Sequence, residues 1–216
     1  MLFNNRIYGL TKGQYSPTSE QGKVTYSTPM GSLDYPFNPT KLALGAKGAF
    51  VAKTIDRDLK HLQSMIKRAN DHRGTSFIEI YQNCNIFNDG AFANLTDKEQ
   101  RGLSRILLED GKPMIFGPEN NLGIILDGFR LKVVEIGKDY SMDDILVHNV
   151  KDKNLANLIS EMTYDEELPV PFGVFYKKEK LTYEDMMIDQ IKDSIKLKGE
   201  PDLQALINGQ ETWEVK

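Results

Sequence analysis

Cysteine and histidine are scarce in this sequence. It contains one cysteine, Cys84, and three histidines, His61, His72 and His148, which lack the spacing of metal ligands. A lone cysteine excludes a disulfide framework within the chain, and scattered histidines do not define a zinc site. The residue pattern alone leaves two roles open for Cys84: a small buried apolar residue, or a member of a functional site.

Long apolar runs and an excess of basic charge are also absent. No run of about 18 apolar residues is present, and Asn4, Asn5 and Arg6 interrupt the apolar start, so neither a transmembrane helix nor a signal peptide is expected. The 27 Lys and Arg against 31 Asp and Glu give a net charge of -4, which offers no electrostatic reason to bind nucleic acid or an anionic membrane. We therefore expect a cytoplasmic protein with no nucleic-acid and no membrane partner.

Strand and helix patterns alternate in the first half of the 216 residues. Asn38-Pro39 predicts the start of a short helix, and an apolar face from Leu59 to Ala69 predicts a second helix, capped by Asp56. Strands are predicted at residues 2–3, 49–53 and 76–82. This alternation favours an α/β fold with a mostly parallel sheet flanked by helices.

The second half departs from this alternation. A capping-box pattern at residues 96–99 predicts a helix to about Glu109, and Asp127-Gly128 predicts a β-hairpin at an edge of the sheet. Other predicted elements are helices at 154–162, 182–198 and 202–208 and a strand at 172–176. We expect residues 1–110 to form part of the α/β domain and residues 111–216 a carboxyl-terminal α+β extension packed on it.

Two polar loops follow predicted strands. The opening strand runs into Asn4-Asn5 and then into a loop that reaches Met30, and loops of that length are often functional. The strand at 76–82 runs into the loop that carries Cys84. Because ligands of open α/β sheets bind outside the carboxyl ends of strands, the two loops are predicted to share one site.

Four motifs, in this order and spacing, resemble the carboxyl-terminal part of the β subunit of 2-oxoacid:ferredoxin oxidoreductases, in particular the 2-oxoglutarate enzymes. They are NNRIYGLTKGQYSPTS at 4–19, TYSTPMG at 25–31, ALGAKGAFVAKT at 43–54 and FIEIYQNCNIFN at 77–88. The resemblance implies a thiamin-diphosphate-binding fold whose amino-terminal part is missing. For the complete enzyme it implies oxidative decarboxylation of a 2-oxoacid to an acyl-CoA, with electrons passing through a 4Fe-4S cluster to ferredoxin.

The resemblance also implies roles for residues of the first loop. Asn5 would bind Mg²⁺ through its side-chain oxygen and Ile7 through its backbone carbonyl. Mg²⁺ prefers such hard oxygen ligands and shares them with phosphate groups, here those of thiamin diphosphate. Tyr8 and Leu10 would face the reactive end of the cofactor, and Thr11 would lie near the diphosphate or the substrate.

Lys12 and Cys84 complete the residues that the resemblance identifies. Lys12 either contacts the diphosphate or an anionic substrate, or is a solvated loop charge. Cys84 matches the position of the isolated fourth cysteine ligand of the family's 4Fe-4S cluster. Thiolates are the usual ligands of such clusters. One thiolate cannot hold a cluster by itself.

The sequence departs from the family pattern in what it lacks. It contains neither the Gly-Asp-Gly motif that precedes the Asn pair in thiamin enzymes nor the other three cysteines. We therefore expect the isolated chain to be inactive and to need the missing amino-terminal half and the α subunit, with ferredoxin, CoA and a 2-oxoacid as further partners. Two alternatives are a truncated non-catalytic scaffold or assembly fragment of the same fold, and a different thiamin-dependent decarboxylase without iron.

Overall fold

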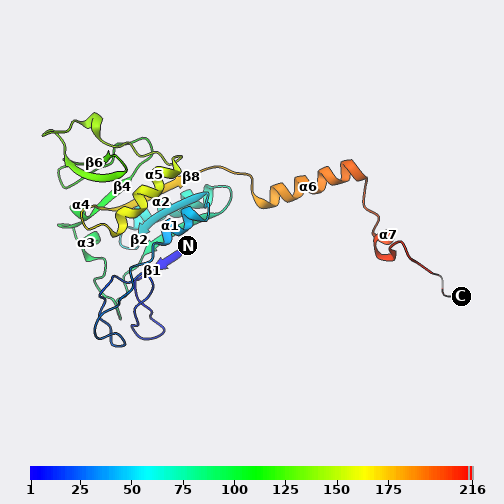
Figure 1. The fold of residues 1–216 in the computed structure, drawn as a ribbon, viewed down its shortest axis with the longest axis horizontal. Coiled ribbons are helices and arrows are strands. Elements are labelled where there is room, and N and C mark those ends of the chain that lie inside the picture. Colours follow the sequence, from blue (N-terminus) through cyan, green and yellow to red (C-terminus); the bar gives the residue numbers. More distant parts are fainter. Residues whose placement is uncertain (214, 216) are drawn as a thin grey trace. The chain divides into compact units, whose positions relative to one another are not determined.

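The computed structural model describes residues 1–213 and 215 and divides the chain into two compact units, Met1–Glu179 and a unit that begins at Lys180 (Figure 1). The first unit contains β1 (Leu2–Asn4), α1 (Pro39–Gly45), β2 (Phe50–Ile55), α2 (Leu59–Asp71), β3 (Ser76–Tyr81), α3 (Ala93–Thr96), α4 (Arg101–Ser104), β4 (Arg105–Leu108), β5 (Ile115–Phe116), β6 (Leu122–Asp127), β7 (Arg130–Glu135), α5 (Lys153–Glu161) and β8 (Val170–Lys177). It also contains the 3₁₀ turns Met142–Asp144 and Met162–Tyr164.

The main sheet has the strand order β1-β3-β2-β8-β4. All of its neighbouring pairs are parallel except β2 and β8. Asn4 lies opposite Tyr81, and Tyr81 lies opposite Ile55, so β1, β3 and β2 end at the same edge of the sheet. The expected mixed α/β class with a mostly parallel sheet is confirmed.

Local capping signals explain where most helices begin. The Asn38 side chain accepts a hydrogen bond from the backbone N–H of Lys41, and Pro39 occupies the first turn of α1, as predicted. The predicted cap of α2 is wrong by two residues, because Asp58 caps this helix by accepting from the backbone N–H of His61. Asp56 instead accepts a hydrogen bond from the backbone N–H of Asn83.

The helix predicted from residue 96 to Glu109 is wrong. The Thr96 hydroxyl donates back to the Phe92 carbonyl, and the Asp97 side chain accepts from the backbone N–H of Glu99, so the capping-box residues form turns. The short helices α3 and α4 lie here, and β4 follows as a strand hydrogen-bonded to β8. Pairing with a distant strand thus overrides the local helix signal.

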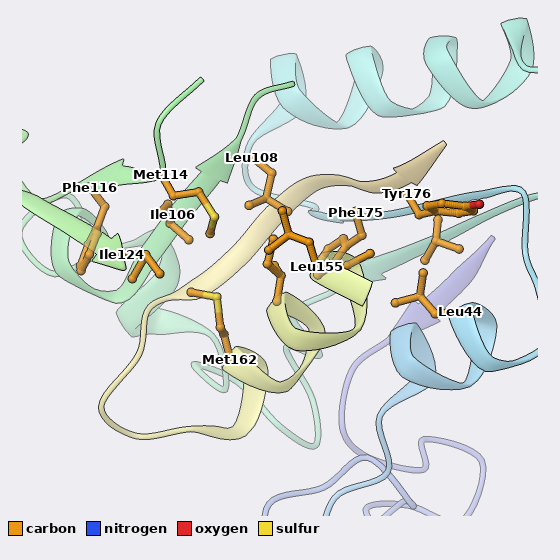
Figure 2. Close-up of a cluster of buried hydrophobic side chains, with 13 residues drawn as sticks. Leu44, Ile106, Leu108, Met114, Phe116, Ile124, Leu155, Met162, Phe175 and Tyr176 are labelled. Atoms are coloured by element: carbon orange, nitrogen blue, oxygen red, sulfur yellow. The ribbon is translucent and has the colours of Figure 1, made fainter. Parts of the chain in front are cut away.

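The predicted hairpin forms but does not lie at an edge of the main sheet. β6 and β7 pair antiparallel around Gly128, whose φ of +62° suits glycine, and β5 joins them in a separate three-stranded sheet. One apolar cluster joins the two sheets, and Figure 2 shows Leu155 of α5 in its middle, between Leu44 of α1 and Ile124 of β6. This shared core holds the first unit together because each fully buried aliphatic side chain contributes about 1.5–3 kcal/mol.

The later elements agree with the capping signals near the end of the chain. The second unit contains α6 (Tyr183–Lys198), capped by Thr182, and α7 (Leu203–Asn208), capped by Asp202. The boundary expected between residues 110 and 111 stays a prediction, and β8, which follows it, lies within the main sheet. Among the described residues, no helix has the length and apolar content needed to cross a membrane.

Candidate functional site

The ends of β1, β3 and β2 bring three polar segments together at one edge of the sheet. The backbone N–H of Gln82, after β3, donates to the Asn4 carbonyl at 3.0 Å, and that of Asp56, after β2, donates to the Tyr81 carbonyl at 2.9 Å. The opening loop and the Cys84 loop therefore start side by side. This confirms their predicted placement at a common edge.

Asn88 ties the Cys84 loop to the opening loop. Its side-chain amide donates to the Asn5 carbonyl at 2.9 Å, and its side-chain oxygen accepts from Lys23 Nζ at 2.6 Å. Asn88 is 6% exposed, so these bonds lie largely out of water. At Gly13, whose φ is +99°, a Cβ atom would come 3.3 Å from the Phe87 ring of the Cys84 loop, so glycine permits this close approach.

The two asparagines of the opening motif have different environments. Asn4 is buried, donates to Glu79 Oε1 at 2.8 Å and accepts from the Thr18 hydroxyl at 2.7 Å. Asn5 is partly exposed, and its side-chain oxygen accepts from the backbone N–H of Ile7 at 3.2 Å, as in an Asx turn. Asn4 therefore secures the loop to the sheet, whereas Asn5 lies at the surface of the site.

The remaining predicted cofactor residues lie in a short closed loop. The backbone N–H of Tyr8 donates to Gln14 and that of Gly13 donates to Tyr8, which pins both ends of the loop. Leu10 is 99% exposed, Tyr8 is 46% exposed, and Thr11 and Lys12 are also exposed. Their side chains therefore face outward from the described part of the chain.

The Cys84 thiol is free and partly exposed. Hydrogen bonding from the backbone N–H of Phe87, aided by those of Ile86 and Asn88, lowers the pKa of the thiol below its ordinary value. Backbone donors that stabilise a thiolate also favour its use as a metal ligand. Among the described residues, no group of three or more His, Cys, Asp or Glu side chains could hold a metal ion.

A buried ion pair beneath the loops was not identified from the sequence. Lys53 and Glu79 face each other across β2 and β3, are 0% exposed, and their Nζ and Oε2 atoms are 3.5 Å apart. Lys53 also donates to the Thr163 hydroxyl at 2.7 Å, and Glu79 accepts from the Thr40 hydroxyl at 2.7 Å. A charge within each predicted apolar strand was the only sequence signal for this pair.

Arg6, the residue after the Asn pair, was also missed. Its φ is +53°, and its guanidinium lies over the rings of Tyr81 and Phe92, at 5.2 and 5.0 Å from their centroids. Its Nε atom is buried and has no hydrogen-bond partner among the described residues. Arg6 also lines a cavity of about 480 Å³ together with Tyr164.

Replacing Asn88 by alanine is expected to loosen the opening loop. The change leaves the Asn5 carbonyl and the Lys23 ammonium without this partner, which should cost about 1–3 kcal/mol of unfolding free energy in urea. Amide exchange at residues 5–19 should also become faster. Asn85→Ala, at an exposed position of the same loop, is the control, and equal effects of the two changes would contradict the role given to Asn88.

Comparisons with known proteins identify the relatives of this chain. Residues 1–80 match the model of the thiamine pyrophosphate enzyme C-terminal TPP binding domain. The 2-oxoglutarate oxidoreductase subunit KorB of Mycobacterium tuberculosis is 43% identical over 100% of this chain and 58% of its own length. The 2-oxoacid:ferredoxin oxidoreductase subunit beta of Saccharolobus solfataricus is 28% identical over 88% of this chain and 52% of its own length.

A solved structure agrees with these relatives. The 2-oxoglutarate:ferredoxin oxidoreductase of Magnetococcus marinus, determined with 2-oxoglutarate, coenzyme A and succinyl-CoA bound, matches with a TM-score of 0.63 and 25% identity. That match covers 98% of this chain and 57% of the other chain. The chain thus spans somewhat more than half the length of these relatives. In sequence and fold the chain is similar to β subunits of 2-oxoacid:ferredoxin oxidoreductases, including proteins named for 2-oxoglutarate, the family that its motifs resemble.

Proposed function

We propose that this chain is part of the β subunit of a 2-oxoglutarate:ferredoxin oxidoreductase and contributes to two cofactor sites. The observation that carries the proposal is the Asn88 bridge, which holds the Asn5 turn against the Cys84 loop. Oxygen donors suited to Mg²⁺ and a sulfur donor suited to iron therefore lie on adjoining loops.

The Asn5 turn fits a share of a Mg²⁺–thiamin diphosphate site. Asn5 is partly exposed, and its side-chain oxygen, which accepts one hydrogen bond from Ile7, has a second lone pair for a metal ion. The Ile7 carbonyl follows in the same turn, although the residue itself is 3% exposed. Tyr8, Leu10, Thr11 and Lys12 are exposed beside it and would contact the cofactor or the substrate. Thiamin diphosphate, when bound, supplies the electron sink that decarboxylation of a 2-oxoacid requires. The chain's own residues hold and orient its diphosphate end.

Cys84 fits one ligand position of a 4Fe-4S cluster. Its thiol is partly exposed, and neighbouring backbone N–H groups lower its pKa. The lower pKa increases the fraction of the thiolate, which is the form that binds iron. The other three ligands would come from the part of the subunit that lies outside this chain. The cluster, when bound, carries electrons one at a time toward ferredoxin.

The partners follow from this division of the sites. The rest of the β subunit would complete both cofactor sites, and the α subunit would complete the enzyme. CoA would accept the acyl group, and ferredoxin would accept the electrons. The 2-oxoglutarate named for the relatives is the substrate that we expect.

The test of the proposed function is activity of the assembled complex. With a saturating low-potential dye as acceptor, the complex should oxidise 2-oxoglutarate faster than pyruvate or branched-chain 2-oxoacids. Activity should require CoA and should fall when Mg²⁺ and thiamin diphosphate are removed. A large preference for pyruvate would contradict the substrate assignment, and undiminished activity without thiamin diphosphate would contradict the mechanism.

A non-catalytic scaffold is the second candidate. It is favoured by the finding that the described residues contain no group of three or more His, Cys, Asp or Glu side chains able to hold a metal ion. A scaffold predicts that the assembled complex gains neither iron nor thiamin diphosphate through this chain. Metal and thiamin analysis of the anaerobically purified complex separates the two candidates, and thiamin without iron would indicate a different thiamin-dependent decarboxylase.

A further inference from the structure

Two neighbouring cavities that share Arg101 and Arg105 are bordered by basic side chains. One cavity, of about 230 Å³, is lined by Arg57, Lys60, Arg101 and Arg105. The other, of about 450 Å³, shares Arg101 and Arg105 and adds Lys112. We call these five side chains the basic surface. We propose that the basic surface docks the acidic face of a protein electron carrier.

One end of the basic surface, at Arg57, adjoins the loop that carries Cys84. Arg57 directly follows Asp56, whose carboxylate accepts a 3.0 Å hydrogen bond from the backbone N–H of Asn83, the residue before Cys84. The contact exists because β2 and β3 end in register. A partner bound over Arg57 would therefore lie beside the Cys84 loop.

The charge of the basic surface is largely uncompensated. Asp58 and Glu109 are the acidic side chains that line the same cavities. Five basic and two acidic side chains give the cavity linings a net charge of +3. Arg105 pairs with Asp58 at 3.3 Å. The other four basic side chains form no salt bridge with any residue that the structure describes. A positive surface on a chain with a net charge of -4 is therefore a local feature.

An acidic protein fits this surface better than a buried ligand does. Four of the five side chains are exposed, and the two cavities share Arg101 and Arg105 and have linings that are more polar than apolar. Electron-transfer complexes use small, weak interfaces, and opposite charges speed their encounter. The inference rests on the proposed function, because an electron carrier is a partner only of an enzyme that releases electrons.

The test reverses charge on the basic surface without touching the Arg105–Asp58 pair. The variant carries Arg57→Glu, Lys60→Glu and Arg101→Glu in the assembled complex. The control carries Lys132→Glu, Lys151→Glu and Lys178→Glu, an equal change of net charge at exposed positions. Lys178 lies at the other end of β2, since its backbone N–H donates to the Ala49 carbonyl.

Ferredoxin-linked turnover should distinguish the two variants. At low salt, the KM for an acidic ferredoxin should rise about tenfold or more in the basic-surface variant and change much less in the control, because electrostatic steering accelerates association by about 10–10³-fold. The difference should shrink at about 1 M salt, where charges are screened within about 3 Å. Turnover with saturating benzyl viologen should stay unchanged.

Other outcomes would overturn the docking surface. Equal effects of variant and control would show that net charge alone matters, and a raised KM for CoA with an unchanged KM for ferredoxin would assign the surface to a phosphate-bearing ligand. The milder pair Lys60→Gln and Arg101→Gln guards against misfolding of the triple variant. Calorimetric titration of the complex with ferredoxin measures docking independently of turnover. If the unmodified complex shows no activity with the dye, that result contradicts the proposed function and leaves the docking surface to be judged by the titration.

Discussion

Replacing Glu79 by alanine is expected to destabilise the first unit by about 3–5 kcal/mol, because it leaves the ammonium group of Lys53 buried without its counter-charge. Both side chains of the pair are 0% exposed, so water cannot take over the lost interaction. The change also removes the acceptor for Asn4 and Thr40. Urea unfolding followed by circular dichroism measures the effect.

Two further variants separate the buried charge from other causes. Glu135→Ala removes an exposed partner of Lys138 and should cost less than about 1 kcal/mol. Adding Lys53→Met to Glu79→Ala removes the unpaired charge and should recover part of the lost stability. If Glu79→Ala cost no more than Glu135→Ala, the pair would have no structural role.

The Glu79→Ala penalty should also depend on pH. Burial lowers the pKa of Lys53, whereas the nearby charge of Glu79 raises it, so the pKa should fall further when Glu79 is removed. Between that lowered pKa and the ordinary value of about 10.4, the unfolded chain binds more protons than the folded protein, so stability rises with pH. Burial lowers the pKa of Lys53 in the unmodified protein as well, so the deficit of the variant should shrink as the pH rises through the interval between the lower pKa in the variant and the higher pKa that Glu79 maintains.

Helix starts and the meeting of the two loops could be predicted because their signals are local or follow from strand order. Asn38, Thr182 and Asp202 cap their helices through bonds to residues three positions away. The carboxyl ends of parallel strands lie at the same edge of a sheet, so the loops that follow β1 and β3 could be expected to start near each other.

Other features depend on contacts between distant residues and could not be predicted. Residues 105–108 became a strand because β8 pairs with them, although β8 begins more than 60 residues later. The Lys53–Glu79 pair required the register of β2 against β3. The Asn88 bridge also joins residues 83 positions apart. The roles of Asn5, Ile7, Tyr8, Leu10, Thr11, Lys12 and Cys84 came from the family resemblance and stay predictions.

Replacing Cys84 by serine is expected to remove most of the iron from the assembled complex. Serine keeps the size and hydrogen-bonding capacity of the side chain, but its hydroxyl does not ionise readily and is a poor ligand for an iron–sulfur cluster. Cluster absorbance and the electron paramagnetic resonance signal of the reduced cluster should fall, and ferredoxin-linked turnover should fall with them. Iron and sulfide analysis after anaerobic purification measures the loss.

The same variant also tests whether Cys84 is instead a packing residue. Cys84 is partly exposed, so Cys84→Ser should change the unfolding free energy of the isolated chain by less than about 0.5 kcal/mol, as at most surface positions. Asn85→Ser, in the adjacent position of the loop, should leave iron content and turnover unchanged. An unchanged cluster signal in Cys84→Ser would refute its assignment as a ligand. Loss of iron in both variants would attribute the effect to the shape of the loop instead of the thiolate.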